Sequence, residues 1–119
     1  MNFEEWLSST HKSREELLSH CKSESPNDSG PRTLDIDKSI RYSDMAGNLL
    51  ADAEYYLSQH SAQSMLKSKT DDPNLPSKDR TYVVRDAVKD IQRIVDGLKV
   101  ACRTLSSRIK SACNARRSY

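Results

Sequence analysis

The sequence holds little glycine and few aromatic residues, and both shortages argue against a β-rich fold. Three glycines, one Phe and one Trp occur among 119 residues, whereas sheets favour turn glycines and alternating β-branched or aromatic side chains. No long apolar run is present, least of all after Met1, so we expect neither a signal peptide nor a membrane span. With 30% charged residues and a mean hydropathy of −0.79, the composition predicts a single all-α domain over residues 1–119.

The motifs of common catalytic sites are also missing. The sequence contains no glycine-rich phosphate loop, no HExxH zinc motif, no CxxC pair and no nucleophile elbow. Its three cysteines are an odd number without a pairing motif, which predicts free thiols in a reducing, cytoplasmic setting. We therefore expect no enzyme, and neither catalytic residues, a metal site nor a cofactor.

One apolar stripe organises the rest of the chain. From Val84 to Ala112, apolar residues recur at alternating steps of four and three, which is the spacing of a helix that buries one face. The stripe predicts a helix over about residues 78–114. Its face is wide, and the flanking positions lack the opposite charges of a coiled-coil dimer, so packing in a bundle is favoured.

Two more helices are predicted to supply the partners of this stripe, over about residues 3–21 and 35–68. Residues 22–34 are rich in Ser, Pro, Asn and Asp and predict a flexible linker inside the domain. Two prolines place a hairpin loop at 69–77. The expected fold is a long antiparallel helical hairpin with a short N-terminal helix, in bundle or coiled-coil-like packing.

The stripe can close this hairpin within one chain or join two chains, and the pattern leaves both options open. Trp6 is either an anchor in the core or an exposed anchor for a partner or a base. The candidate interface residues are Val84, Val88, Ile91, Val95, Leu98, Leu105, Ile109 and Trp6.

Charge is distributed unevenly along the chain. Residues 1–60 carry six basic and eleven acidic residues, residues 61–119 carry thirteen and six, and no acid follows Asp96. A basic end can bind phosphates or the acidic half of another copy, and it also suits the negative end of a helix dipole. The candidate nucleic-acid-binding residues are Lys67, Lys69, Arg103, Arg108, Lys110, Arg116 and Arg117.

Residues 36–66 carry short motifs that resemble one family. Ile36-Asp37 is followed by Ile40-x-Tyr42 and then by the run Tyr56-Leu57-Ser58-Gln59-His60-Ser61. These motifs resemble those of the phage recombination mediators related to UvsY, with a two-residue shift between them. The resemblance implies an oligomeric, all-helical accessory protein that binds single-stranded DNA and helps to load a recombinase. It assigns no DNA-binding residue here, so the basic positions above depend on charge alone.

The sequence therefore favours a small, self-associating accessory protein of phage or mobile-element DNA metabolism that binds single-stranded nucleic acid. The expected partners are further copies of the chain, single-stranded DNA, and a recombinase or a host protein, without a membrane. The alternative is a non-enzymatic protein-binding module, such as an adaptor or an inhibitor of a host defence complex. The two hypotheses differ in the working surface, which is basic for DNA and acidic or apolar for a protein.

Overall fold

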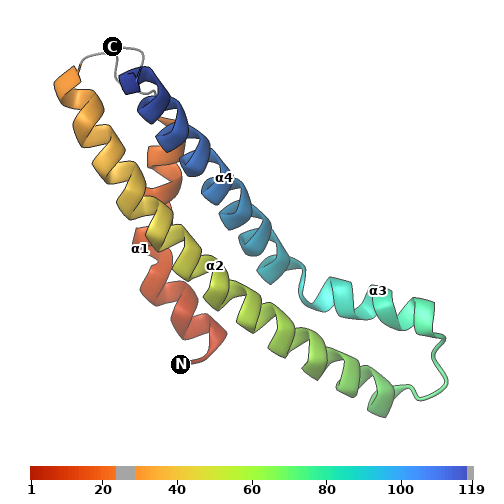
Figure 1. Ribbon diagram of the computed structural model, residues 1–119. Coiled ribbons are helices and arrows are strands. Elements are labelled where there is room, and N and C mark those ends of the chain that lie inside the picture. Colours follow the sequence, from red (N-terminus) through yellow and green to blue (C-terminus); the bar gives the residue numbers. More distant parts are fainter. Residues whose placement is uncertain (24–28, 118–119) are drawn as a thin grey trace. The chain divides into compact units, whose positions relative to one another are not determined.

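The computed structural model describes residues 1–23 and 29–117, with side chains over 1–23 and 34–114. Four helices occupy these residues: α1 (Phe3–Lys22), α2 (Ser29–Asp71), α3 (Ser77–Ala87) and α4 (Lys89–Arg117) (Figure 1). The prediction of an all-α helical hairpin is confirmed. Within the described residues, no helix combines the length and the apolar character needed to cross a membrane.

The first helix has the limits that its sequence predicts. The Asn2 side chain accepts a hydrogen bond from the backbone N–H of Glu5 at 2.8 Å, which satisfies one free donor of the first turn. Glu4 and Glu5 place negative charge at the positive end of the helix dipole. At the other end, the Ser23 hydroxyl and N–H both donate to the His20 carbonyl, at 2.7 and 3.2 Å.

The second helix begins earlier than the sequence suggests. It starts at Ser29 rather than near residue 35, so residues 29–34 are helix and not linker. Pro31 is compatible with this start, because N–H groups in the first turn of a helix have no intrahelical partner to lose. Residues 24–28 of the predicted linker lie outside the described residues.

The predicted helix over residues 78–114 is in fact two helices. α3 ends at Ala87 and α4 begins at Lys89, and Figure 1 shows the chain changing direction there. Val88 lies at the break and is buried, whereas no residue of α3 is buried. The helix therefore breaks where its side chains first enter the core. Neither Gly nor Pro, the usual causes of a break, lies there.

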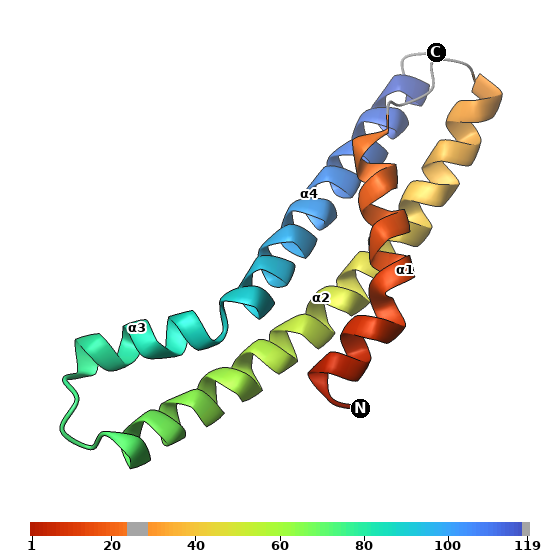
Figure 2. The ribbon, with the colours of Figure 1, turned by 180° about the vertical axis from the view of Figure 1, so that it is seen from behind.

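The chain forms two compact units, residues 1–49 with 98–119 and residues 50–97. In the first unit, α1 lies beside the adjoining parts of α2 and α4 (Figures 1 and 2). Its buried apolar residues are Trp6, Leu17, Ile36, Ala46, Leu49, Leu98, Ala101 and Leu105. In the second unit, the buried apolar residues are Ala53, Tyr56, Val88, Ile91 and Val95.

A short loop joins α2 to α3 in the second unit. The Arg80 guanidinium donates to the carbonyls of Asp72 and Leu75, at 3.0 and 3.1 Å. The Arg80 N–H donates to the Pro76 carbonyl at 3.0 Å. One side chain of α3 thus holds the loop that the two prolines predicted.

Candidate nucleic-acid interface

The outer face of α4 in the first unit carries a row of cations. Lys99, Arg103 and Lys110 are exposed, and Ser106 and Ser107 lie between the last two. At 3.6 residues per turn, the three cations fall within about 40° of one another around the helix. We call Lys99, Arg103 and Lys110 the α4 basic face. An open depression of about 450 Å³ follows this face and is lined by Cys102, Arg103, Ser106, Ser107 and Lys110.

The α4 basic face keeps its charge exposed to solvent. Among the described residues, none of its three side chains forms an ion pair or a hydrogen bond. The last acid in the sequence is Asp96, so α4 itself carries no acid along this part. Such a face attracts anions, and it loses no internal contact when it binds one.

Arg108 belongs to the interior and not to this face. Its Nε and Nη2 donate to the two carboxylate oxygens of Asp35 at 2.9 and 2.5 Å. Its Nη1 donates to the carbonyls of His20 and Ser23 at 3.2 and 2.8 Å. The Arg108 side chain is 8% exposed and that of Asp35 10%. Arg108 therefore holds the end of α1 against α2 and α4, and it is not available to bind a phosphate without breaking these contacts.

Among the described side chains, the α4 basic face contains only part of the predicted basic set. Lys67 and Lys69 are exposed on α2 in the second unit. Arg116 and Arg117 lie in the last turn of α4, and their side chains lie outside the described residues. Of the seven predicted residues, the structure groups Arg103 with Lys110 and adds Lys99. The sequence already contained that signal, since 99, 103 and 110 have helical spacing.

The predicted interface residues are used mainly inside the chain. Val88, Ile91, Val95, Leu98 and Leu105 are all buried at 6% exposure or less. Val84 and Ile109 are half-buried. The stripe thus closes the hairpin within one chain in this structure, which leaves little of it for another copy.

Trp6 is buried, at 3% exposure. Its ring stacks on Phe3 with 5.9 Å between ring centroids. The Arg14 guanidinium lies 5.8 Å from the centre of the indole, a distance typical of a cation–π contact. In this structure Trp6 has the position expected of a core anchor rather than of an exposed docking residue.

Three residues of the interior combine the side chains of a catalytic triad without its geometry. The His20 Nε2 lies 2.9 Å from the Ser39 hydroxyl and 3.9 Å from an Asp35 oxygen. In a triad the acid contacts the other ring nitrogen and the serine faces the substrate. Here Ser39 is 0% exposed, and Asp35 is bound to Arg108. This cluster therefore joins helices and does not form a nucleophilic site.

The same surroundings disfavour the charged form of His20. Burial is the largest cause that lowers its pKa, and the nearby Arg108 charge lowers it further, while Asp35 acts in the opposite direction. The imidazole also packs on the Tyr42 ring, with 4.9 Å between centroids. His20 is therefore predominantly neutral at pH 7.

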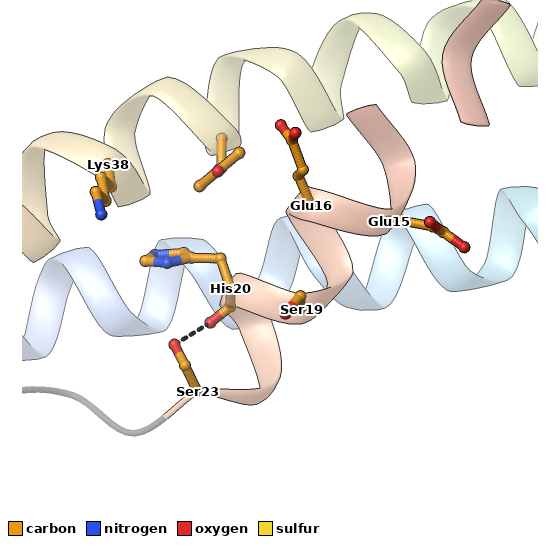
Figure 3. A pocket seen from close by; sticks show the side chains of 7 residues that line it. Glu15, Glu16, Ser19, His20, Ser23 and Lys38 are labelled. Carbon is orange, nitrogen blue, oxygen red and sulfur yellow. Dashed lines mark hydrogen bonds between the residues drawn. The ribbon is translucent and has the colours of Figure 1, made fainter. Parts of the chain in front are cut away.

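A groove of about 500 Å³ runs between α1 and α2 beside His20 (Figure 3). It is lined by Glu15, Glu16, Ser19, His20, Ser23, Lys38 and Tyr42. Figure 3 shows that α1 contributes the acids and α2 contributes Lys38. Because the two walls carry opposite charges, the groove has no preference for an anion, and the α4 basic face is the better candidate for phosphate.

The structure assigns no metal or thiol chemistry to the described residues. No three His, Cys, Asp or Glu side chains gather there in a way that could hold a metal ion. The three cysteines are free. Burial raises the pKa of the Cys21 and Cys102 thiols, which keeps them in the less reactive protonated form.

Fold and surface together define an all-α protein with an exposed basic helix face. Comparison with known proteins finds no family model, no curated protein and no solved structure that matches the chain.

Proposed function

We propose that the protein binds single-stranded nucleic acid through phosphate contacts of the α4 basic face. The observation that carries this proposal is the row of three exposed cations that have no acid partner among the described residues. A rise of 1.5 Å per residue spreads them over about 17 Å, which is enough to follow several phosphates of one strand. Ser106 and Ser107 add hydroxyl donors between Arg103 and Lys110.

The chemistry of this face favours binding without sequence preference. Lysine and arginine on an exposed convex helix bind the charged backbone, whereas base recognition needs side chains fixed against base edges or aromatic platforms. We further propose that the protein acts as an accessory protein in phage or mobile-element DNA recombination. The support for this role is the motif resemblance over residues 36–66.

Substitution of the face tests the proposal by fluorescence anisotropy with a labelled oligo-dT at low salt. Arg103→Ala combined with Lys110→Ala removes two of three phosphate contacts, and we expect affinity to fall at least tenfold. The matched control is Lys12→Ala, an exposed cation on α1 in the same unit, which should leave affinity within twofold. Equal affinities for the double variant and the wild type would exclude the α4 basic face as the binding surface.

The recombination role needs a separate assay. A mediator should speed the assembly of a recombinase on oligo-dT that a single-strand-binding protein already covers. Stimulation that is lost in the Arg103→Ala, Lys110→Ala variant would support the role. Binding to bare oligo-dT without any stimulation would leave phosphate binding in place and remove the mediator role.

The alternative function is a protein-binding module, and one observation favours it. The second unit exposes the large apolar side chains of Tyr55, Leu66, Tyr82 and Val83. Exposed apolar side chains that gather on one face can mark a protein interface. The positions of these four side chains around α2 and α3 determine which of them can form one continuous interface.

A further inference from the structure

We infer that the outer face of α2 pairs with the same face of a second copy in an antiparallel dimer. The face consists of Tyr55, Gln59, Ala62 and Leu66, and we call it the α2 outer stripe. All four are exposed, Tyr55 at 62% and Leu66 at 66%. This surface and this partner are independent of the proposed phosphate binding.

The α2 outer stripe has the spacing of a helix-pairing seam. Its residues follow at steps of four, three and four, so they lie on one side of the helix. Ala53 lies on the far side of α2 and is buried in the second unit, so the stripe faces away from the core. Ala62 at its middle is small and allows close approach of another helix.

The exposed apolar residues of α3 do not form such a seam. Tyr82 and Val83 are neighbours in sequence, and adjacent residues diverge by about 100° around a helix. Asp79 and Asp86 lie one turn before Val83 and one turn after Tyr82, which puts acidic charge between their directions. The α2 outer stripe is therefore the better docking surface of the second unit.

Self-complementarity identifies the partner as a second copy. An antiparallel pair centred between residues 60 and 61 sets each Tyr55 opposite the partner's Leu66 and each Gln59 opposite the partner's Ala62. A two-fold interface of this kind uses the same patch on both copies. At each end of the seam, the ring of one Tyr55 then covers the partner's Leu66. Both side chains are exposed in a single chain.

Charge sets the direction of the pair. Asp52 and Glu54 precede the seam, and Lys67 and Lys69 follow it. About the same centre, Asp52 is level with the partner's Lys69, and each lies within about 50° of the middle of the stripe, whereas Glu54 and Lys67 point about 110° away from it. A parallel pair would instead place acids beside acids and lysines beside lysines. Opposite charges at both ends thus favour the antiparallel arrangement and disfavour the parallel one.

The dimer should be weak, because three helical turns bury less area than the roughly 1,200 Å² of a stable complex. Sedimentation of the full chain without nucleic acid should therefore show a monomer–dimer equilibrium with a Kd on the order of tens of micromolar. Tyr55→Ser with Leu66→Ser should raise this Kd at least tenfold. Tyr82→Ser with Val83→Ser also removes one tyrosine and one aliphatic side chain, here from α3, and should leave the Kd unchanged.

A charge-reversal series tests the direction and the partner together. Lys69→Glu should raise the Kd severalfold, and the further change Asp52→Lys should recover part of that loss. Far-UV circular dichroism confirms that each variant is helical. A chain that stays monomeric at several hundred micromolar would overturn the inference, and so would an equal effect of the α3 pair. If the Tyr55, Leu66 variant lost oligo-dT binding while the wild type sedimented as a monomer, the stripe would be a nucleic-acid surface instead.

Discussion

At the scale of single residues, the Arg108–Asp35 ion pair connects the helices of the first unit. Asp35 comes from α2 and Arg108 from α4, and the carbonyls that Arg108 also binds belong to the end of α1. One guanidinium thus joins three helices. Removal of one member of a buried pair leaves an uncompensated charge, which typically costs about 3–5 kcal/mol.

We therefore expect Arg108→Ala to lower the free energy of unfolding by about 3 kcal/mol in urea denaturation. Arg103→Ala, an exposed arginine on the same helix, should change it by no more than about 0.5 kcal/mol. The double variant Asp35→Leu, Arg108→Met should recover much of the loss, because no charge stays buried. A loss below about 1 kcal/mol for Arg108→Ala would mean that water compensates Asp35 and that the pair is not structural.

His20 makes the stability of the first unit depend on pH. Its folded-state pKa is lowered, so between that value and the unfolded value near 6.5 the unfolded chain binds more protons. Stability should therefore be complete above about pH 6.5 and should fall as the pH drops below it. Arg108, Asp35 and Lys38 are the charged groups that act on this ring.

Urea unfolding at pH 5, 6, 7 and 8 measures this dependence. His20→Gln should lose less stability than the wild type between pH 7 and pH 5, because it lacks the titrating ring. His11→Gln changes an exposed histidine on the same helix, paired with Glu15 at 3.2 Å, and should follow the wild type. A His20→Gln profile parallel to the wild type would contradict the assignment.

At the scale of elements, α3 should be the least protected of the helical segments in the second unit. None of its eleven residues is buried, whereas Ile91 and Val95 fix the start of α4 in the core. Backbone groups in a helix without buried side chains open at little cost.

Hydrogen exchange followed by mass spectrometry measures this difference. Amides of residues 80–87 should exchange at least tenfold faster than amides of residues 92–97. Equal protection in the two segments would contradict this expectation. It would mean that α3 packs against a surface that is absent from the single chain.

The helices themselves were largely predictable from the sequence. The four-three period gave the buried face from Val88 to Leu105, and the two prolines gave the loop, because both signals are local. The break at Val88 was not predictable, since the apolar period continues through it without Gly or Pro. The early start of α2 was hidden because Gly30 and Pro31 are typical of loops, although a first turn tolerates them.

The candidate site was predictable only in part. Helical spacing groups Lys99 with Arg103 and Lys110 directly from the sequence. Arg108 has the same charge and a similar place in the chain, yet its partner Asp35 is 73 residues away. A local sequence pattern cannot show a contact between residues so far apart in the sequence. Charge alone therefore placed Arg108 with the exposed cations, although its side chain is buried.

At the scale of the whole molecule, the α4 basic face and the α2 outer stripe lie in different units. Phosphate binding and self-association can therefore be removed one at a time by substitution. If both operate, each dimer carries two basic faces, and linked sites bind one strand more tightly than a single site does.

The most direct test of the central claim is the salt dependence of oligo-dT binding. For single strands the slope of log K against log salt concentration is about −0.7 per phosphate contact. Three cations per chain thus predict a slope of about −2 for the wild type and of about −0.7 for Arg103→Ala with Lys110→Ala. A wild-type slope near zero, or the same slope in both proteins, would contradict phosphate binding by the α4 basic face.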